Sequence, residues 1–176
     1  MDGKCISGCN FKYDGAISAW LQSLADDTNM MAHRQLKANL SNLSYVFTEV
    51  KCHYKCSSLS AELNKEYTLL VPDTNLYDIM LLGAKYKQKA IINKDGSTIN
   101  IMDTDVGRIL ASIKYDGGDI KYWVMIYAEY IRCKYGMDSK IEIVSLEKLH
   151  IPMRTESLLR SKEKEGLAAT RWVSLF

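Results

Sequence analysis

The chain has little that would divide it into parts. It contains only two prolines among 176 residues, and no Ser/Gly-rich or low-complexity run marks a linker. A chain of this length with 47% hydrophobic residues is long enough to bury one core. We therefore expect a single domain over residues 1–176.

Long apolar runs and a strong charge of one sign are also missing. No run approaches the roughly 20 apolar residues that cross a bilayer, and the start Met1-Asp2-Gly3-Lys4 lacks a secretory signal pattern. Five cysteines, an odd number, fit reduced thiols better than a disulfide framework. We expect an intracellular protein, in cytoplasm or nucleus, with no membrane partner. The net charge of +2 gives no general argument for nucleic acid, and the segment Lys85-Tyr86-Lys87-Gln88-Lys89 is the local exception.

Hydrophobic spacing predicts helices followed by strands in the first half of the chain. A short first helix carries Ile17, Trp20, Leu21 and Leu24, and a longer one, capped within 26–28, carries Ala32, Leu36, Leu40, Leu43 and Phe47. From Thr48 the period changes to two, which predicts a strand with Val50, Cys52 and Tyr54 on one face. A brief helix over 57–63 and a strand over 67–71 follow.

In the second half of the chain, hydrophobic spacing and turn residues predict a hairpin, two helices, a strand and a last helix. Residues 76–82 fit a helix or a buried strand equally well, and strands over 86–92 and 98–102 flank the Asp95-Gly96 turn. Helices follow over 106–113, capped by Asp103 or Thr104, and from Asp119 to a Gly136 stop. A strand over 140–146 and a helix from Pro152 to near Trp172 complete an α+β domain, a small mixed β-sheet flanked by helices.

One acid is placed where a metal ligand of a nuclease would be expected. Asp73 follows Val71-Pro72, and proline ends a strand because it has no N–H to donate. Metal-dependent phosphodiester cleavage needs a cation that activates water and neutralises developing charge. Carboxylates with one imidazole suit Mg²⁺ or Mn²⁺, and a nearby lysine can meet the transition-state charge. His33, Asp73, Lys114 and the Asp119-Ile120-Lys121 segment are the candidates.

The order of these elements resembles the cap-snatching endonuclease domain of segmented negative-strand RNA virus polymerases, a PD-(D/E)XK-like fold found in influenza-like viruses at the N-terminus of the acidic subunit. The likeness is carried by four segments: Met31-Ala32-His33-Arg34, Val71-Pro72-Asp73 with Leu76-Tyr77-Asp78, residues 140–146, and residues 167–176. It implies Mn²⁺- or Mg²⁺-dependent RNA cleavage in a host cell, with other polymerase subunits as partners. Under it, His33, Asp73, Asp103 and Asp119 bind metal, while Lys114 or Lys121 assists the chemistry.

The sequence departs from this family at the second acid. The best-matching segment, Thr98-Ile99-Asn100-Ile101, has an amide at that position, and an amide brings no negative charge to a hard cation. Neither Lys114 nor Lys121 matches the lysine spacing well. If Asn100 takes the acid position, metal affinity falls and the domain is a degenerate copy retained as a scaffold.

Other interpretations compete for the same residues. His33 also fits a half-buried histidine, and Asp73 and Asp119 fit a turn residue and a helix cap. Zinc has one candidate set, Cys5, Cys9, Cys52 and Cys56, although strand alternation already explains Cys52 as a buried residue. In a non-catalytic alternative, a protein- or nucleic-acid-binding scaffold of a viral or phage assembly, Lys85, Lys87 and Lys89 form one strand face that contacts phosphates or only protects an edge.

Overall fold

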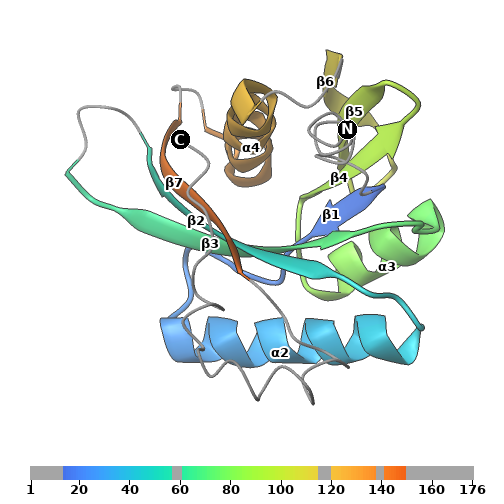
Figure 1. The fold of residues 1–176 in the computed structure, drawn as a ribbon. Helices are drawn as coiled ribbons and strands as arrows, with labels where there is room; N and C mark the ends of the chain where they lie inside the picture. Colours follow the sequence, from blue (N-terminus) through green and yellow to red (C-terminus); the bar gives the residue numbers. More distant parts are fainter. Residues whose placement is uncertain (1–13, 57–60, 115–119, 138–140, 150–176) are drawn as a thin grey trace, which may run out of the picture.

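A curled antiparallel sheet of seven strands forms the centre of this protein in the computed structural model (Figure 1). The structure describes residues 14–56, 61–114, 120–137 and 141–149. The strands lie in the order β6-β5-β4-β1-β3-β2-β7, and each pairing of neighbouring strands is antiparallel. The predicted α+β class is confirmed, whereas the predicted mixed sheet is wrong, because no described pair of strands is parallel.

The inner part of the sheet follows a simple repeating order. The elements are β1 Gly15–Ile17, α2 Asp26–Asn42, β2 Thr48–Lys55, β3 Asn64–Val71, α3 Leu76–Lys85, β4 Ala90–Asp95, β5 Thr98–Asp103, β6 Ile109–Lys114, α4 Ile120–Tyr135 and β7 Glu142–Leu149. From β1 to β4 the order is βαββαβ, with β4-β1-β3-β2 as neighbours, which is the arrangement of a ferredoxin-like unit. Strands β5 and β6 extend it beside β4, and β7 extends it beside β2.

Helices cover both faces of the sheet (Figure 1). On one side, which we call the α2 face, Leu36 of α2 and Ile79 of α3 pack with Leu69 of β3. On the other side, the α4 face, Tyr127 of α4 packs with Leu70. Successive residues of a strand point to opposite faces, so a buried run such as Leu69-Leu70-Val71 supplies both cores.

Several predictions from local pattern are confirmed. Strand β2 buries Val50, Cys52 and Tyr54 on the α4 face. The ambiguous segment after Asp73 is a helix, α3, whose N-cap Asn75 accepts the backbone N–H of Tyr77. The hairpin turns at residues 96–97, with Gly96 at φ 64°, and Gly136 has the left-handed φ of 61° expected after a helix. One detail of the predicted long helix is wrong: α2 ends at Asn42, so Leu43 and Phe47 lie outside it.

Two predicted helices are strands or loops. Ile17 belongs to the short strand β1, and the segment from Ser18 to Leu21 that follows has no helix. Ile109 and Ile113 lie in β6, which pairs with β5 through Ile101↔Ala111. Of the predicted helix over 57–63, residues 61–63 are not helical and 57–60 lie outside the described residues. The predicted helix from Pro152 also lies outside them.

Candidate nucleic-acid interface

The two leading metal candidates, His33 and Asp73, lie in different surroundings. His33 is buried between α2 and the sheet at 1% exposure, and its Nε2 lies 2.7 Å from Oε2 of Glu49. Its ring contacts Trp20 and Tyr67. Asp73 is exposed after β3, at a left-handed φ of 50°. The imidazole is therefore held by a carboxylate of β2, and the common pocket for His33 and Asp73 stays a prediction.

Asp103 has a structural role instead of the predicted helix cap. Its Oδ1 accepts backbone N–H groups of Asp105, Val106 and Gly107 at 2.8–3.1 Å, and Arg108 lies 3.6 Å from Oδ2. Hydrogen bonding from these N–H groups, that of Val106 first, holds the pKa of Asp103 below its ordinary value. The carboxylate therefore closes the turn before β6.

The remaining nuclease candidates are spread over the fold. Asn100 lies within β5, where its Oδ1 accepts from the hydroxyl of Ser112 at 2.6 Å. Lys114 is exposed at the end of the edge strand β6, and Lys121 lies at the start of α4. Asp119 lies outside the described residues. Within the described ranges, no group of three or more His, Cys, Asp or Glu side chains could hold a metal ion.

The zinc set is only half described. Cys52 is buried in β2, where burial raises the pKa of its thiol, and Cys56 is half-buried. Cys5 and Cys9 lie outside the described residues. Zinc coordination by these four residues therefore stays a prediction.

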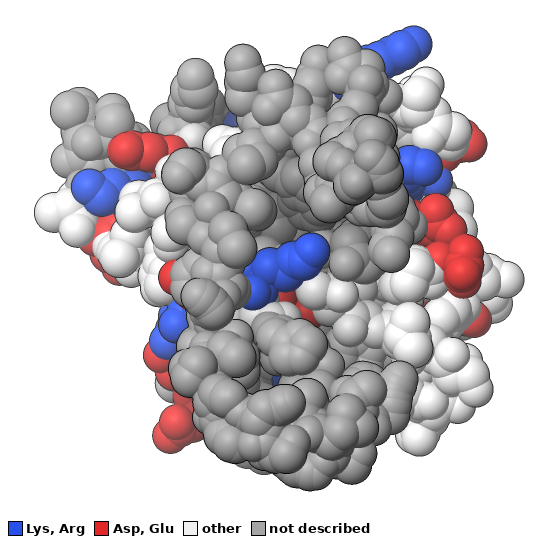
Figure 2. All heavy atoms as spheres, in the orientation of Figure 1, with Lys and Arg blue, Asp and Glu red and all other residues white. Residues whose placement is uncertain are grey.

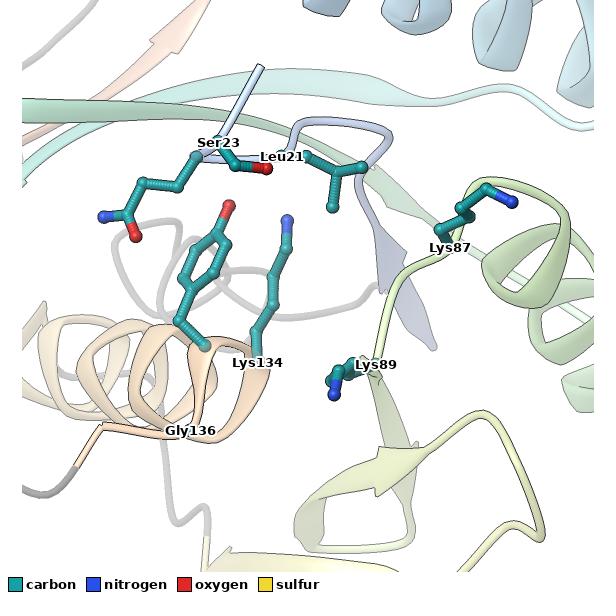
Figure 3. Close-up of a pocket in the computed structure, with 8 residues that line it drawn as sticks. Leu21, Ser23, Lys87, Lys89, Lys134 and Gly136 are labelled. Atoms are coloured by element: carbon teal, nitrogen blue, oxygen red, sulfur yellow. The ribbon is translucent and has the colours of Figure 1, made fainter.

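Charged side chains of both signs are interspersed on the described part of the face in Figure 2. A local exception is a cavity of about 250 Å³ between the end of α4 and the start of β4 (Figure 3). We call it the lysine cavity. Its described lining contains three lysines and no carboxylate: Leu21, Gln22, Ser23, Lys87, Lys89, Lys134, Tyr135 and Gly136.

The prediction that Lys85, Lys87 and Lys89 share one strand face is wrong. Lys85 is the last residue of α3, and Lys87 and Lys89 precede β4. The backbone N–H of Lys87 bonds to the carbonyl of Ala84, and that of Gln88 to the carbonyl of Gly83. These two bonds form a Schellman motif that ends α3, and they place Lys87 at φ 56°, where glycine is usual.

This turn places two exposed cations at the rim of the lysine cavity. Lys87 and Lys89 are exposed, and neither forms an ion pair with a described carboxylate. Between them Gln88 is buried, and its Nε2 donates to the carbonyls of Trp20 and Tyr86. In Figure 3 the Lys87 side chain turns away from Lys134 and the cavity, whereas the Lys89 side chain is seen nearly end-on between α4 and the start of β4. Lys89 is therefore the better placed of the two to meet a bound anion.

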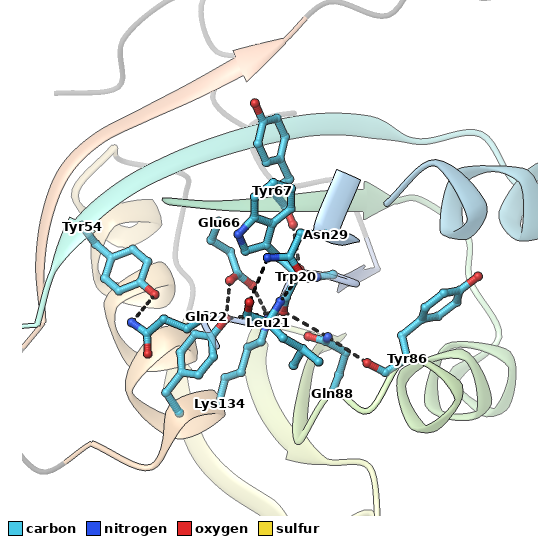
Figure 4. A network of polar contacts seen from close by, with 12 residues as sticks. Trp20, Leu21, Gln22, Asn29, Tyr54, Glu66, Tyr67, Tyr86, Gln88 and Lys134 are labelled. Atoms are coloured by element: carbon cyan, nitrogen blue, oxygen red, sulfur yellow. Dashed lines mark hydrogen bonds and ion pairs between the residues drawn. The ribbon is translucent and has the colours of Figure 1, made fainter. Parts of the chain in front are cut away.

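One lining residue of the cavity, Lys134, belongs to a buried ion pair (Figure 4). Lys134 of α4 and Glu66 of β3 are 1% and 0% exposed and form a salt bridge. Lys134 Nζ also donates to the carbonyl of Trp20 at 2.7 Å, and Tyr135 donates its hydroxyl to Glu66 Oε1 at 2.8 Å. Burial lowers the pKa of Lys134, and the Glu66 carboxylate opposes that effect. The pair fixes α4 and the segment after β1 to β3.

Sequence reasoning missed this pair, although a signal was present. Lys134 lies seven residues after Tyr127 and three after Ile131, so it continues the buried stripe of α4. Glu66 lies four residues before Leu70, on the same face of β3. A cation in one buried stripe and an acid in the other predict a buried salt bridge when the helix packs on the strand.

Comparisons of the chain with protein-family models, with curated proteins and with solved structures gave no match. No helix within the described ranges is long and apolar enough to span a membrane.

Proposed function

We propose that this domain binds single-stranded RNA without catalysing its cleavage. In this proposal Lys89 contacts a backbone phosphate at the lysine cavity, and Lys87, whose side chain turns away from the cavity (Figure 3), contacts a neighbouring phosphate of the same strand. The observation that carries the proposal is the pair of exposed lysines in the cavity lining. Lys87 and Lys89 form no ion pair with a described carboxylate, whereas the charge of the third lysine, Lys134, is balanced by Glu66. Lysine binds phosphate oxygens as a point charge, and such contacts supply most of non-specific nucleic-acid affinity.

The backbone of Lys87 supports the same proposal. A non-glycine residue at φ 56° is strained, and such strain concentrates at functional sites. Glycine would fit this turn better, so the fold alone does not account for a lysine there. A positive charge at the rim of the cavity does account for it.

Lysine variants test the proposal directly. We expect Lys89→Gln to weaken binding of a fluorescent single-stranded RNA by about fivefold at low salt, and to reduce the salt slope of log Kd by about 1. Arg34→Gln on α2 is the matched control, because Arg34 is an exposed cation and does not line the lysine cavity. Fluorescence anisotropy at several salt concentrations measures both quantities. Equal losses in both variants, or no binding at low salt, would overturn the proposal.

Lys87→Gly separates binding from folding. Glycine adopts the left-handed conformation at residue 87 without steric cost, so we expect an unchanged or higher melting temperature together with weaker RNA binding. A variant that folds better and binds less cannot owe its defect to unfolding. Unchanged RNA affinity in this variant would remove Lys87 from the interface.

Metal-dependent cleavage and the PD-(D/E)XK-like fold of a viral polymerase subunit stay predictions from the resemblance alone. The binding assay is therefore repeated with Mn²⁺ and analysed by denaturing electrophoresis. RNA cleavage, with a melting temperature raised by Mn²⁺, would support the endonuclease over the binding module. Intact RNA and an unchanged melting temperature would support non-catalytic binding.

A further inference from the structure

A second cavity, of about 370 Å³, borders the same segment after β1. We call it the amide cavity. It is lined by Trp20, Gln22, Leu24, Asp26, His53, Leu63, Asn64 and Lys65. Gln22 lines both cavities, while Leu21 and Ser23 line only the lysine cavity and Trp20 and Leu24 only this one. The two cavities therefore lie next to each other across residues 20–24.

The polar groups of the amide cavity are arranged to accept hydrogen bonds. Gln22 Nε2 donates to the hydroxyl of Tyr54 at 3.0 Å, and Asn64 Nδ2 donates to Sγ of Cys56 at 3.7 Å. Among the described residues, no group donates a hydrogen bond to the carbonyl oxygen of either amide. Amide side chains are the groups that commonly pair with the edges of nucleobases.

An imidazole in the same lining can either donate or accept. His53 Nδ1 lies 3.2 Å from Oγ of Ser145. Burial lowers the pKa of His53, and the nearby Lys51 and Lys65 lower it further, against a smaller opposite effect of Glu147. The ring is therefore neutral at pH 7, and its Nε2 can meet either kind of group on a base edge.

Apolar surface is present beside these polar groups. Leu24 and Leu63 line the cavity and are 43% and 52% exposed. A flat heterocycle can cover such side chains while its edge reaches the amides. The only charges in the described lining are those of Asp26 and Lys65, which pair at 2.9 Å. A neutral ring with polar edges fits this lining better than a phosphate does.

We infer that the amide cavity holds an unpaired nucleobase of the same RNA strand whose phosphate lies in the lysine cavity. This inference rests on the proposed function, and it names the ligand class as single-stranded nucleic acid with an accessible base. In base-paired RNA the bases are stacked and their Watson–Crick edges are occupied, so a base cannot enter the cavity and pair with Gln22 and Asn64. Selectivity for single strands follows.

The test compares an RNA oligomer with an abasic oligomer of the same length and charge. We expect the wild-type protein to bind the base-containing strand at least tenfold more tightly than the abasic one. Asn64→Leu, similar in size, should remove most of that preference and leave abasic binding unchanged. Lys89→Gln should weaken both ligands by the same factor, and duplex RNA should bind more weakly than the single strand.

The outcomes separate the two claims. Equal binding of both strands by the wild type overturns the base site and leaves phosphate binding standing. A preference that survives in Asn64→Leu also overturns it, because the base is then held elsewhere. If neither strand binds, both claims fail. Thermal melting checks that Asn64→Leu is folded, and His53→Leu, a second apolar change in the same lining, replaces it if it is not.

Discussion

Both faces of the sheet bury an acid beside a base, but they do so in different ways. On the α4 face, Glu66 and Lys134 are sealed from water and have further hydrogen-bond partners. On the α2 face, Glu49 binds His33 at 2.7 Å and Lys37 at 2.9 Å, and the Lys37 side chain is 31% exposed. The first system is closed to solvent, and the second is open at one end.

Because of this difference, we expect the Glu66–Lys134 pair to depend wholly on its partners, and the Glu49 system to respond to the pH and salt of the solvent. A buried charge that loses its partner has no water to solvate it. Removing either Glu66 or Lys134 alone therefore leaves an uncompensated charge in the core and destabilises the fold. The α2-face acid keeps a route to solvent through Lys37, and His33 Nδ1 has no hydrogen-bond partner among the described residues. We therefore expect the α4 face to govern stability and the α2 face to govern its pH dependence.

The largest expected effect comes from breaking the closed pair. Glu66→Gln leaves Lys134 charged and buried, and we expect a loss of about 3–5 kcal/mol of unfolding free energy in urea denaturation. Glu129→Gln is the matched control. Glu129 and Arg132 form an ion pair on α4, the helix that carries Lys134, but both of their side chains are 37% exposed. That change should cost less than about 1 kcal/mol.

A double variant sharpens this expectation. Glu66→Leu combined with Lys134→Met replaces the pair by apolar side chains, and it should recover most of the stability lost in Glu66→Gln. A double variant as unstable as the single one would contradict the account in which the unpaired charge causes the loss.

The second effect concerns pH on the α2 face. Burial raises the pKa of Glu49, but hydrogen bonds from His33 and Lys37 outweigh burial and hold the pKa below its ordinary value of 4.5. A lowered pKa stabilises the fold above the ordinary value, and this contribution is lost as pH falls through the folded-state pKa. We expect Glu49→Gln to cost about 1.5–3 kcal/mol at pH 7, because hydrogen bonds to a charged group are lost.

The difference between wild type and Glu49→Gln should shrink as pH falls below 4.5 and vanish at lower pH. Urea denaturation at a series of pH values from 7 to 3 measures it. If the two proteins lose stability in parallel over this range, Glu49 does not provide the pH dependence.

The smallest effect is expected at the open end of the α2-face system. Lys37→Met removes a half-exposed charge but keeps the aliphatic stem, so we expect a loss of about 0.5 kcal/mol at low salt. The loss is measured as a difference in melting temperature between wild type and Lys37→Met. Because salt screens exposed charges, 1 M NaCl should remove most of this difference. A loss as large as that of Glu66→Gln would show that the two systems do not differ as described.

The elements that sequence pattern predicts well are those whose signal is local. The stripe containing Leu36 and Leu40 specifies α2, and the Asp95-Gly96 pair specifies the hairpin. The predictions fail where distant pairing decides. Ile17 lies in a strand buried on both faces, so it shows no alternation, and Ile109 has helical spacing with Val106 and Ile113 but pairs with β5.

The candidate site was predictable only in part. The lysines around residue 87 stand out in the sequence, yet their strand assignment missed the Schellman motif, because glycine usually marks such a turn. The role of His33 could not be read from its own helix, since Glu49 lies sixteen residues away. Gln22 carries no motif at all, and its place between two cavities comes only from the fold.

The three-residue strand β1 has a mechanical consequence for the whole sheet. It pairs with β3 through Gly15↔Val71 to Ile17↔Leu69 and with β4 through Gly15↔Asn93 and Ala16↔Ile92. Three strands lie on each side of β1, so the hydrogen bonds of this short strand join the two halves of the sheet. Beyond Ile17 no described strand joins β3 to β4, and the chain segment that follows β1 there borders both cavities.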